Sequence, residues 1–250
     1  MKNLALFSAF CLCACAPTPA KPADKPADKP VVAQGQTVPP EVDSRLTETE
    51  RATKPLVADL ASALDGGDFR LALKLIDQAN AKWAAAGLAA EYAEPKANAL
   101  LGLNQNKEAL DALGPLEHVS SNQGATCASL ALLRLGREKE ARAMYSDQLI
   151  TRFLPSMSYR LVPSSKTTAK LEANIRLARG MDDFQNGLAK SSMRELKESD
   201  RLAPLVPLTS YFIGQLYLMA KDQKNARLYL ATASKMPGPL GQDAKSLIPK

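Results

Sequence analysis

Apolar residues recur every three to four positions along most of the chain, a spacing that places them on one face of an α-helix. One such run has leucines at every fourth position, Leu56, Leu60 and Leu64. Residues 65–68, Asp-Gly-Gly-Asp, end this run, and the next stripe comprises Phe69, Ala72, Leu73, Ile76 and Ala79. No stretch alternates apolar and polar residues for long enough to indicate a β-sheet. The pattern predicts an all-α fold over residues 43–250, with Thr47 and Glu50 as a capping box at its first helix.

Short polar turns divide this region into similar pairs of helices. The turns lie at residues 102–106, 136–137, 180–183 and 221–224. We use the first small residue of each second helix to compare the pairs: Ala72, Ala109, Ala141, Gly187 and Ala226. The pattern predicts about five helix–turn–helix units between residues 44 and 237. We expect residues 151–165 to form a long loop, and residues 242–247 to form part of a capping helix.

The last pair carries the most specific spacing. Gly214 is followed three residues later by Tyr217 and twelve residues later by Ala226. Further along the same pair stand Leu230, Ala233 and Pro237. This order of small, aromatic and helix-ending residues resembles the tetratricopeptide repeat, in which small residues let the two helices approach closely. The resemblance implies an α-solenoid of such repeats, although Ile175 occupies the small position in the fourth unit. A generic helical bundle remains the alternative.

In the tetratricopeptide family, first helices line a concave groove that binds a peptide or a partner's helix. Carried over to the last unit, the resemblance assigns this groove to Leu208, Tyr211, Gln215 and Leu218. In the second unit it assigns Glu91, Glu94, Asn98 and Leu101, and in the third Gln123, Thr126, Leu130 and Leu133. The alternative is that several of these leucines pack against the adjacent helix. Trp83, expected just past the end of a second helix, is also interpreted as a packing residue.

The N-terminus has the pattern of an export signal. Lys2 precedes an uncharged apolar run from Leu4 to Ala14, which is too short to span a bilayer and fits the apolar region of a signal peptide. The run ends Leu12-Cys13-Ala14-Cys15, which resembles a bacterial lipobox. The resemblance implies that residues 1–14 are removed and that Cys15 is lipidated. An ordinary cleaved signal, or a metal cluster of Cys11, Cys13 and Cys15, are the alternatives.

Residues 15–42 have a different composition from the rest of the chain. Seven of the 17 prolines lie here, and Lys-Pro-Ala-Asp occurs twice in succession. Proline fixes φ and removes backbone donors, so we expect a disordered linker that favours extended polyproline II, with a reach of about 80 Å if fully stretched. Ala16, rather than an aspartate, follows the lipidated cysteine, which favours the outer membrane.

The remaining sequence offers few residues for catalysis. Charged residues are mixed, with Lys+Arg 32 against Asp+Glu 26, so the net charge of +6 forms no basic stripe for nucleic acid. The single histidine, His118, and Cys127 show no sign of mutual activation. The carboxylate pairs Asp182–Asp183 and Glu195–Glu198 are interpreted as solvated charge. We find no motif for a metal or cofactor and expect a protein that is not an enzyme.

These observations predict a lipid-anchored protein of the bacterial envelope, placed on the outer membrane and facing the periplasm. Its expected partners are the membrane, through the anchor, and an envelope protein or peptide segment bound by the helical repeats. Such an adaptor would serve pilus, secretion or outer-membrane assembly. Two alternatives remain open at this point. One is a helical-repeat lipoprotein that binds a small ligand or glycan, and the other is an enzyme that uses Cys127 or paired carboxylates.

Overall fold

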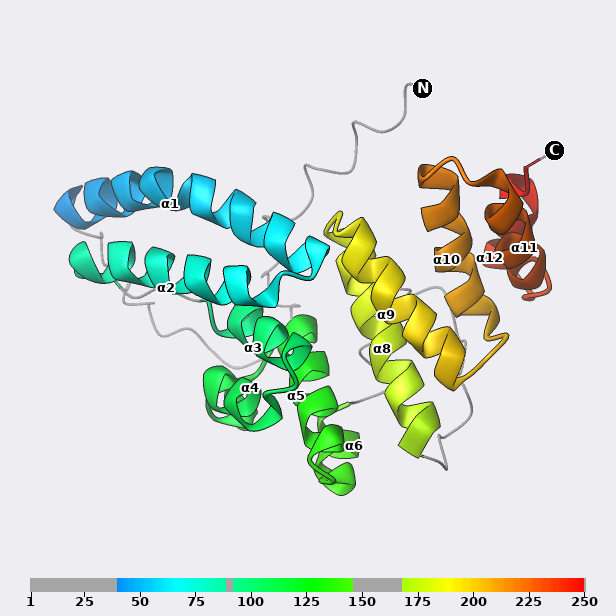
Figure 1. The fold of residues 1–250 in the computed structure, drawn as a ribbon, viewed down its shortest axis with the longest axis horizontal. Helices are drawn as coiled ribbons and strands as arrows, with labels where there is room; N and C mark the ends of the chain where they lie inside the picture. Colours follow the sequence, from blue (N-terminus) through cyan, green and yellow to red (C-terminus); the bar gives the residue numbers. More distant parts are fainter. Residues whose placement is uncertain (1–39, 89–91, 146–167, 250) are drawn as a thin grey trace, which may run out of the picture. The chain divides into compact units, whose positions relative to one another are not determined.

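A computed structural model describes residues 40–88, 92–145 and 168–249, with side chains from residue 44 onward. Within these ranges the protein is all-α and contains no strand, which confirms the all-α part of the prediction (Figure 1). The helices are α1 (Pro40–Gly66), α2 (Phe69–Ala85), α3 (Ala93–Gly102), α4 (Asn106–Leu113), η1 (Leu116–His118), α5 (Asn122–Arg134), α6 (Glu138–Met144), α8 (Thr168–Gln185), α9 (Ala189–Leu202), α10 (Pro207–Met219), α11 (Gln223–Ala233) and α12 (Pro239–Leu247). The signal peptide, Cys15, the residues of the linker before Pro40 and the expected loop at 151–165 lie outside the described residues.

Consecutive helices pack as hairpins: α1 with α2, α3 with α4, α5 with α6, α8 with α9 and α10 with α11. We number these pairs hairpins 1 to 5. The first turn forms as its sequence suggests, because Gly67 adopts φ +80°, which side chains disfavour, and Asp68 Oδ1 accepts the Leu71 N–H to cap α2. The expected capping box is wrong. Thr47 lies inside α1, which begins at Pro40 and runs through this position without a break.

All five hairpins share one register. A buried residue stands at the corresponding position of each first helix, and at the last two of these the helices of the hairpin cross closely: Leu60, Ala97, Ser129, Gly180 and Gly214. Twelve residues later each second helix has a small buried residue: Ala72, Ala109, Ala141, Ser192 and Ala226. Four residues further stand Ile76, Leu113, Tyr145, Leu196 and Leu230. We call the first set the crossing residues.

This register corrects the sequence interpretation of hairpin 4. Gly187, used there as the small residue of the second helix, lies in the turn at φ +76°, and Ser192 occupies the small position. Likewise Gly180, not Ile175, is the crossing residue. A Cβ added at Gly180 would lie 2.6 Å from Leu196 Cγ, and one at Gly214 would lie 2.7 Å from Leu230 Cγ. Hairpins 4 and 5 therefore cross in the same way, and their crossing glycines are 34 residues apart.

A hydrogen-bonded contact joins α1 to α9, two helices that lie far apart in the chain. Asp65, near the end of α1, accepts the backbone N–H groups of Lys190 and Ser191 at 2.8 and 3.0 Å, in the first turn of α9. Leu188, the residue before α9, has no side-chain oxygen with which to cap these donors. Arg194 of α9 donates in return to the carbonyl of Leu64 at 3.4 Å. The carboxylate of one helix thus caps another helix 125 residues away.

Replacing Asp65 by alanine is expected to lower the free energy of unfolding by about 1 kcal/mol, the usual loss when a helix cap is removed. Asp59→Ala, an exposed position on the same helix, is the matched control and should change stability by less than about 0.5 kcal/mol. Urea unfolding followed by circular dichroism measures both. Equal stabilities of the two variants would show that the Asp65 contact contributes nothing.

Helix α12 covers the far end of hairpin 5, where the sequence indicates part of a capping helix. Leu240, Leu247 and Ile248 pack against the core that includes Leu230. Gly241 allows close approach, because a Cβ at this position would lie 1.9 Å from the carbonyl oxygen of Met236. The apolar end of hairpin 5 is therefore shielded from solvent.

Candidate functional site

The groove positions inferred for hairpin 5 are only partly accessible. Leu208 and Tyr211 are buried, at 4% and 7% exposure, whereas Gln215 and Leu218 are half-buried. The Tyr211 hydroxyl donates a hydrogen bond to Asp243 on α12. The proximity of that carboxylate, together with burial, raises the pKa of the Tyr211 hydroxyl. At this end of the chain, α12 therefore occupies part of the surface that the family resemblance assigns to a ligand.

The inferred groove positions of hairpins 2 and 3 are also largely packed. Asn98 is buried and accepts a 2.7 Å hydrogen bond from Arg179 of α8, and Leu101 is 2% exposed. Thr126, Leu130 and Leu133 are buried as well. The half-buried members are Glu94, which accepts a hydrogen bond from Ser121, and Gln123. Glu91 lies outside the described residues, and peptide binding at this set of positions stays a prediction.

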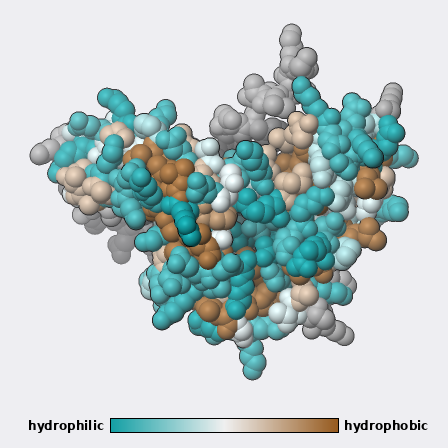
Figure 2. All heavy atoms as spheres, viewed as in Figure 1, coloured by the Kyte–Doolittle hydropathy of each residue, from teal (hydrophilic) through white to brown (hydrophobic). Residues whose placement is uncertain are grey.

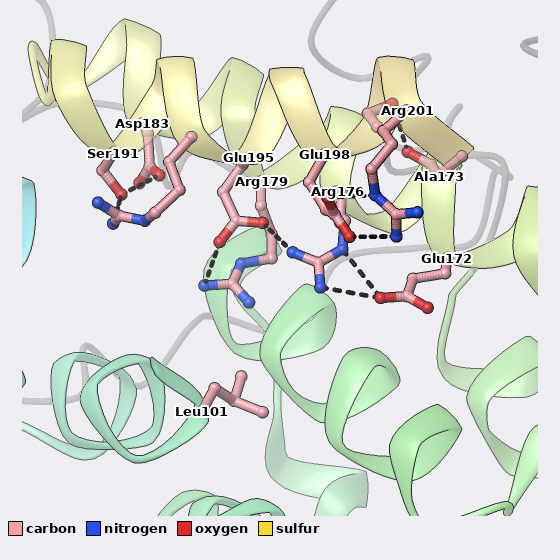
Figure 3. A network of polar contacts seen from close by, with 12 residues as sticks. Leu101, Glu172, Ala173, Arg176, Arg179, Asp183, Ser191, Glu195, Glu198 and Arg201 are labelled. Atoms are coloured by element: carbon pink, nitrogen blue, oxygen red, sulfur yellow. Dashed lines mark hydrogen bonds and ion pairs between the residues drawn. The ribbon is translucent and has the colours of Figure 1, made fainter. Parts of the chain in front are cut away.

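A buried group of charges lies between α3, α5, α8 and α9, and we call its central members, Glu172, Arg176, Arg179 and Glu195, the Glu195 cluster (Figure 3). Glu195 Oε2 accepts a hydrogen bond from Arg176 at 3.0 Å, and its Oε1 lies 3.3 Å from Arg179 Nη2. Arg176 also pairs with Glu172 at 2.8 Å. The side chains of Arg179 and Glu195 are each only 8% exposed. The carboxylate of Glu195 thus pairs with two guanidinium groups inside the protein, and Glu172 supplies a second negative charge beside Arg176.

Electrostatics inside the protein keep Arg179 charged. Burial alone would lower the pKa of Arg179, but neighbouring acids, Glu195 first among them, hold its pKa above the usual value. The interpretation of Glu195 and Asp183 as solvated charge is wrong, because they are 6% and 4% exposed. The signal in the sequence was the spacing of Glu172, Arg176, Arg179 and Asp183 by three or four residues, which marks one face of a helix.

Two aspartates beside this cluster titrate abnormally. Burial, and after it the nearby charge of Glu94, raise the pKa of Asp182 to about 6 against the opposing effect of Arg179. Burial also raises the pKa of Asp183 to about 6, although Arg179 and a hydrogen bond donated by Ser191 lower it. Ionising either carboxylate is therefore more costly in the folded protein than in water.

The raised pKa of Asp182 predicts a pH-dependent loss of stability. Folding favours the protonated form of the Asp182 carboxyl. The contribution of this group to the free energy of unfolding is therefore complete below about pH 4 and is lost as the pH rises through about 6. Asp182→Asn is therefore expected to be more stable than wild type at pH 7, by about 1–2 kcal/mol, and to differ little at pH 4. Urea unfolding at both pH values tests this. Asp77→Asn, at an exposed position on α2, should leave the profile unchanged.

The two residues considered for nucleophilic chemistry lie in different environments. Cys127 is buried in α5, at 1% exposure, and burial raises the pKa of its thiol to about 11. At neutral pH it is therefore a thiol rather than the reactive thiolate. His118 is exposed at the end of η1. Trp83 is half-buried, and its buried indole N–H has no hydrogen-bond partner among the described residues.

The structure also has a hollow on hairpin 1, away from the Glu195 cluster. It has a volume of about 330 Å³ and is lined by Asp59, Ser62, Ala63, Gly66, Asp68, Leu71 and Leu75. Figure 2 shows hydrophobic surface in the region of α1 and α2. None of these seven residues was selected from the sequence as a site residue, because their pattern along the chain is that of ordinary amphipathic helices.

Two further statements hold for residues 40–88, 92–145 and 168–249. No group of three or more His, Cys, Asp or Glu side chains there is placed to hold a metal ion. None of the helices there combines the length and the apolar character that crossing a bilayer requires.

Comparison with protein families, with curated proteins and with solved structures yields no significant match to this chain.

Proposed function

We propose that this protein is a membrane-anchored adaptor of the bacterial envelope. In this proposal Cys15 carries the lipid and the helical hairpins form an α-solenoid similar to tetratricopeptide repeats. Residues 16–39 form the tether, which is shorter than the linker expected from the sequence because residues 40–42 belong to α1. The solenoid binds another envelope protein, in assembly of a pilus, a secretion system or the outer membrane. The anchor would be on the outer membrane and face the periplasm.

The observation that carries the proposal is the common register of the five hairpins. Each has a crossing residue, a small residue twelve positions later and, in four of the five, a large buried residue four positions after that. Stacked helical hairpins provide extended surfaces for recognition and are widely used to bind proteins. A lipid anchor adds to this by raising the local concentration of the adaptor near its partners.

The properties of the buried ionisable groups favour binding over catalysis. Cys127 is held in its thiol form, and Glu195 is fully engaged by two arginines. Asp183 accepts a hydrogen bond from Ser191. A nucleophile or general base has to reach its substrate, and these groups are 1–6% exposed.

The anchor is tested by replacing Cys15 with serine. The variant is expected to move from the membrane pellet to the soluble fraction and to lose labelling by radioactive palmitate, because the serine oxygen does not receive the lipid. Cys13→Ser is the matched control and should stay with the membrane. Unchanged pelleting and labelling of Cys15→Ser would reject the lipid anchor at this residue.

The adaptor role is tested by crosslinking in intact cells, followed by purification of the full chain and identification of what is attached. The expected result is one envelope protein, captured with wild type and strongly reduced with Cys15→Ser, since loss of the anchor lowers the local concentration. Recovery of no protein above the level of a control lipoprotein would contradict the adaptor role.

A further inference from the structure

The hollow on hairpin 1 lies on the face of α1 and α2 that points away from the next hairpin. Phe69 and Leu73 of α2 belong to the side that packs toward α3, where Phe69 lies against Gly102. Leu71 and Leu75 lie on the opposite side and line the hollow together with Ala63. Leu71 is 42% exposed, which is high for a leucine at the centre of a helical face.

The same face is covered in every later hairpin. The exposure of the residue just before each crossing residue indicates whether this face is covered. Asp59 of hairpin 1 is exposed, whereas its counterparts are half-buried or buried: Lys96, Ala128, Arg179 and Ile213. The helix that covers hairpins 2, 3 and 5 is the second helix of the preceding hairpin, namely α2, α4 and α9. Within the described residues, hairpin 1 has no preceding hairpin.

Hairpin 5 shows which chemistry this cover uses. Tyr217 and Tyr229 lie three residues after Gly214 and Ala226, just as Ala63 and Leu75 lie three residues after their counterparts in hairpin 1. Lys197 of the covering helix α9 reaches over both tyrosine rings, with Nζ 5.1 and 4.3 Å from their centroids. Its Nζ also donates a 2.6 Å hydrogen bond to the Tyr229 hydroxyl. In hairpin 5 the covering helix therefore places a basic side chain beside the apolar face.

The hollow on hairpin 1 is matched to a basic helix by its charge. Its only charged lining residues are Asp59 and Asp68, and Asp68 is fixed in place by capping α2. A second copy of this chain is a poorer occupant. Pairing this face with itself across a two-fold axis would bring the same two carboxylates toward each other, and like charges repel.

We propose that this hollow binds an amphipathic helix of a partner protein, with an apolar stripe that covers Ala63, Leu71 and Leu75 and a lysine or arginine that pairs with Asp59 and Asp68. This proposal rests on the adaptor function above and names the chemistry of its partner. The helix takes the place that the preceding second helix occupies in hairpins 2, 3 and 5, so recognition extends the stacking of the fold itself.

Two synthetic helical peptides test the proposal by fluorescence anisotropy with the full chain. Both have leucines at positions i, i+4 and i+7; one carries lysines beside this stripe and the other carries glutamates at the same positions. We expect the lysine peptide to bind at least about tenfold more tightly than the glutamate peptide. Equal binding of the two peptides, or binding of neither, would overturn the proposal.

Matched variants locate the binding. Leu71→Ser should weaken the affinity for the lysine peptide by about tenfold. Leu228→Ser, which replaces an exposed leucine on α11, should leave this affinity unchanged. Asp59→Lys should weaken the affinity for the lysine peptide by about fivefold and strengthen the affinity for the glutamate peptide. Asp77→Lys should change neither affinity. Because Asp59 and Leu71 are exposed, these replacements should preserve the circular dichroism spectrum and melting temperature. Loss of binding in the controls as well would place the peptide elsewhere and reject this hollow.

Other occupants give different results. Sedimentation of a dimer that Leu71→Ser abolishes would identify a second copy and overturn the proposal. A photo-crosslinker at Ser62 that reacts with residues 1–39 of the same chain would also overturn it.

If the lysine peptide fails to bind but Leu71→Ser still captures the envelope partner in cells, this inference falls and the adaptor function stands. If capture by wild type fails, the adaptor function itself falls.

Discussion

Replacing Glu195 by alanine is expected to lower the free energy of unfolding by about 3–5 kcal/mol, the usual cost of removing one partner of a buried ion pair. Without this carboxylate, Arg179 would keep its hydrogen bond to Asn98, and Arg176 would keep its pairing with Glu172. Both guanidinium groups would remain charged and mostly shielded from water, at 8% and 11% exposure. Urea unfolding followed by circular dichroism measures the loss.

A second glutamate on the same helix provides the control. Glu198 pairs with Arg201 three residues away at 2.7 Å, but the Arg201 side chain is 66% exposed. Surface pairs of this kind contribute about 0.2–1 kcal/mol, so Glu198→Ala should have a small effect. If Glu195→Ala cost no more than Glu198→Ala, the buried pairing described for Glu195 would be incorrect.

Leucine at position 214 is expected to destabilise the protein by about 3 kcal/mol or more, because the crossing point of hairpin 5 has no room for a side chain. Even the first added carbon would lie 2.7 Å from Leu230 Cγ and 3.3 Å from the Leu230 backbone nitrogen. The helices would have to separate, which exposes the core around Ile213. Thermal unfolding should show a clearly lower melting temperature, and Gly180→Leu should behave similarly because its surroundings match.

Gly66→Leu is the corresponding control for a glycine with space around it. A Cβ at Gly66 would have nothing within 4 Å. Leucine also favours helix more than glycine does, so this variant should retain or slightly raise the melting temperature. An unaltered melting temperature in Gly214→Leu would contradict the close crossing of α10 and α11.

The sequence predicted the helices and turns that depend on local residue types. Residues 65–68 combine two glycines with a capping aspartate, and α1 ends and α2 begins there. Gly214 and Ala226 were found because they follow the spacing of a known repeat. The turn is readable because it is set by the backbone preferences of a few adjacent residues, and the crossing of α10 and α11 because it follows a fixed spacing within one hairpin.

The sequence interpretation of hairpin 4 was wrong because glycine can serve two different structural purposes, and the sequence alone does not show which one applies. Gly187 supplies a left-handed turn, whereas Gly180 lets two helices approach. Both occur near the expected position, and only the path of the chain separates them. Placing the small residue at Ser192 restores the spacing of 34 residues to Ala226.

The buried charges and the hollow were beyond sequence reasoning for another reason. Whether Glu195 meets water or two arginines depends on how α8 and α9 pack together, and a charged residue is exposed in most proteins. Asp65 likewise finds its partners 125 residues away. The exposure of Leu71 depends on which face lacks a covering helix. Each property belongs to the assembled hairpins rather than to any one segment.

The hydrogen bonds between Asp65 and the first turn of α9 change how the domain is expected to unfold. In an array held only by contacts between successive repeats, an end repeat can fray without disturbing the others. Here the first hairpin is also tied to the fourth, so its loss removes a cap from α9. Opening should therefore be cooperative between these distant segments, and amide protons in the first turn of α9 should exchange together with those of α1.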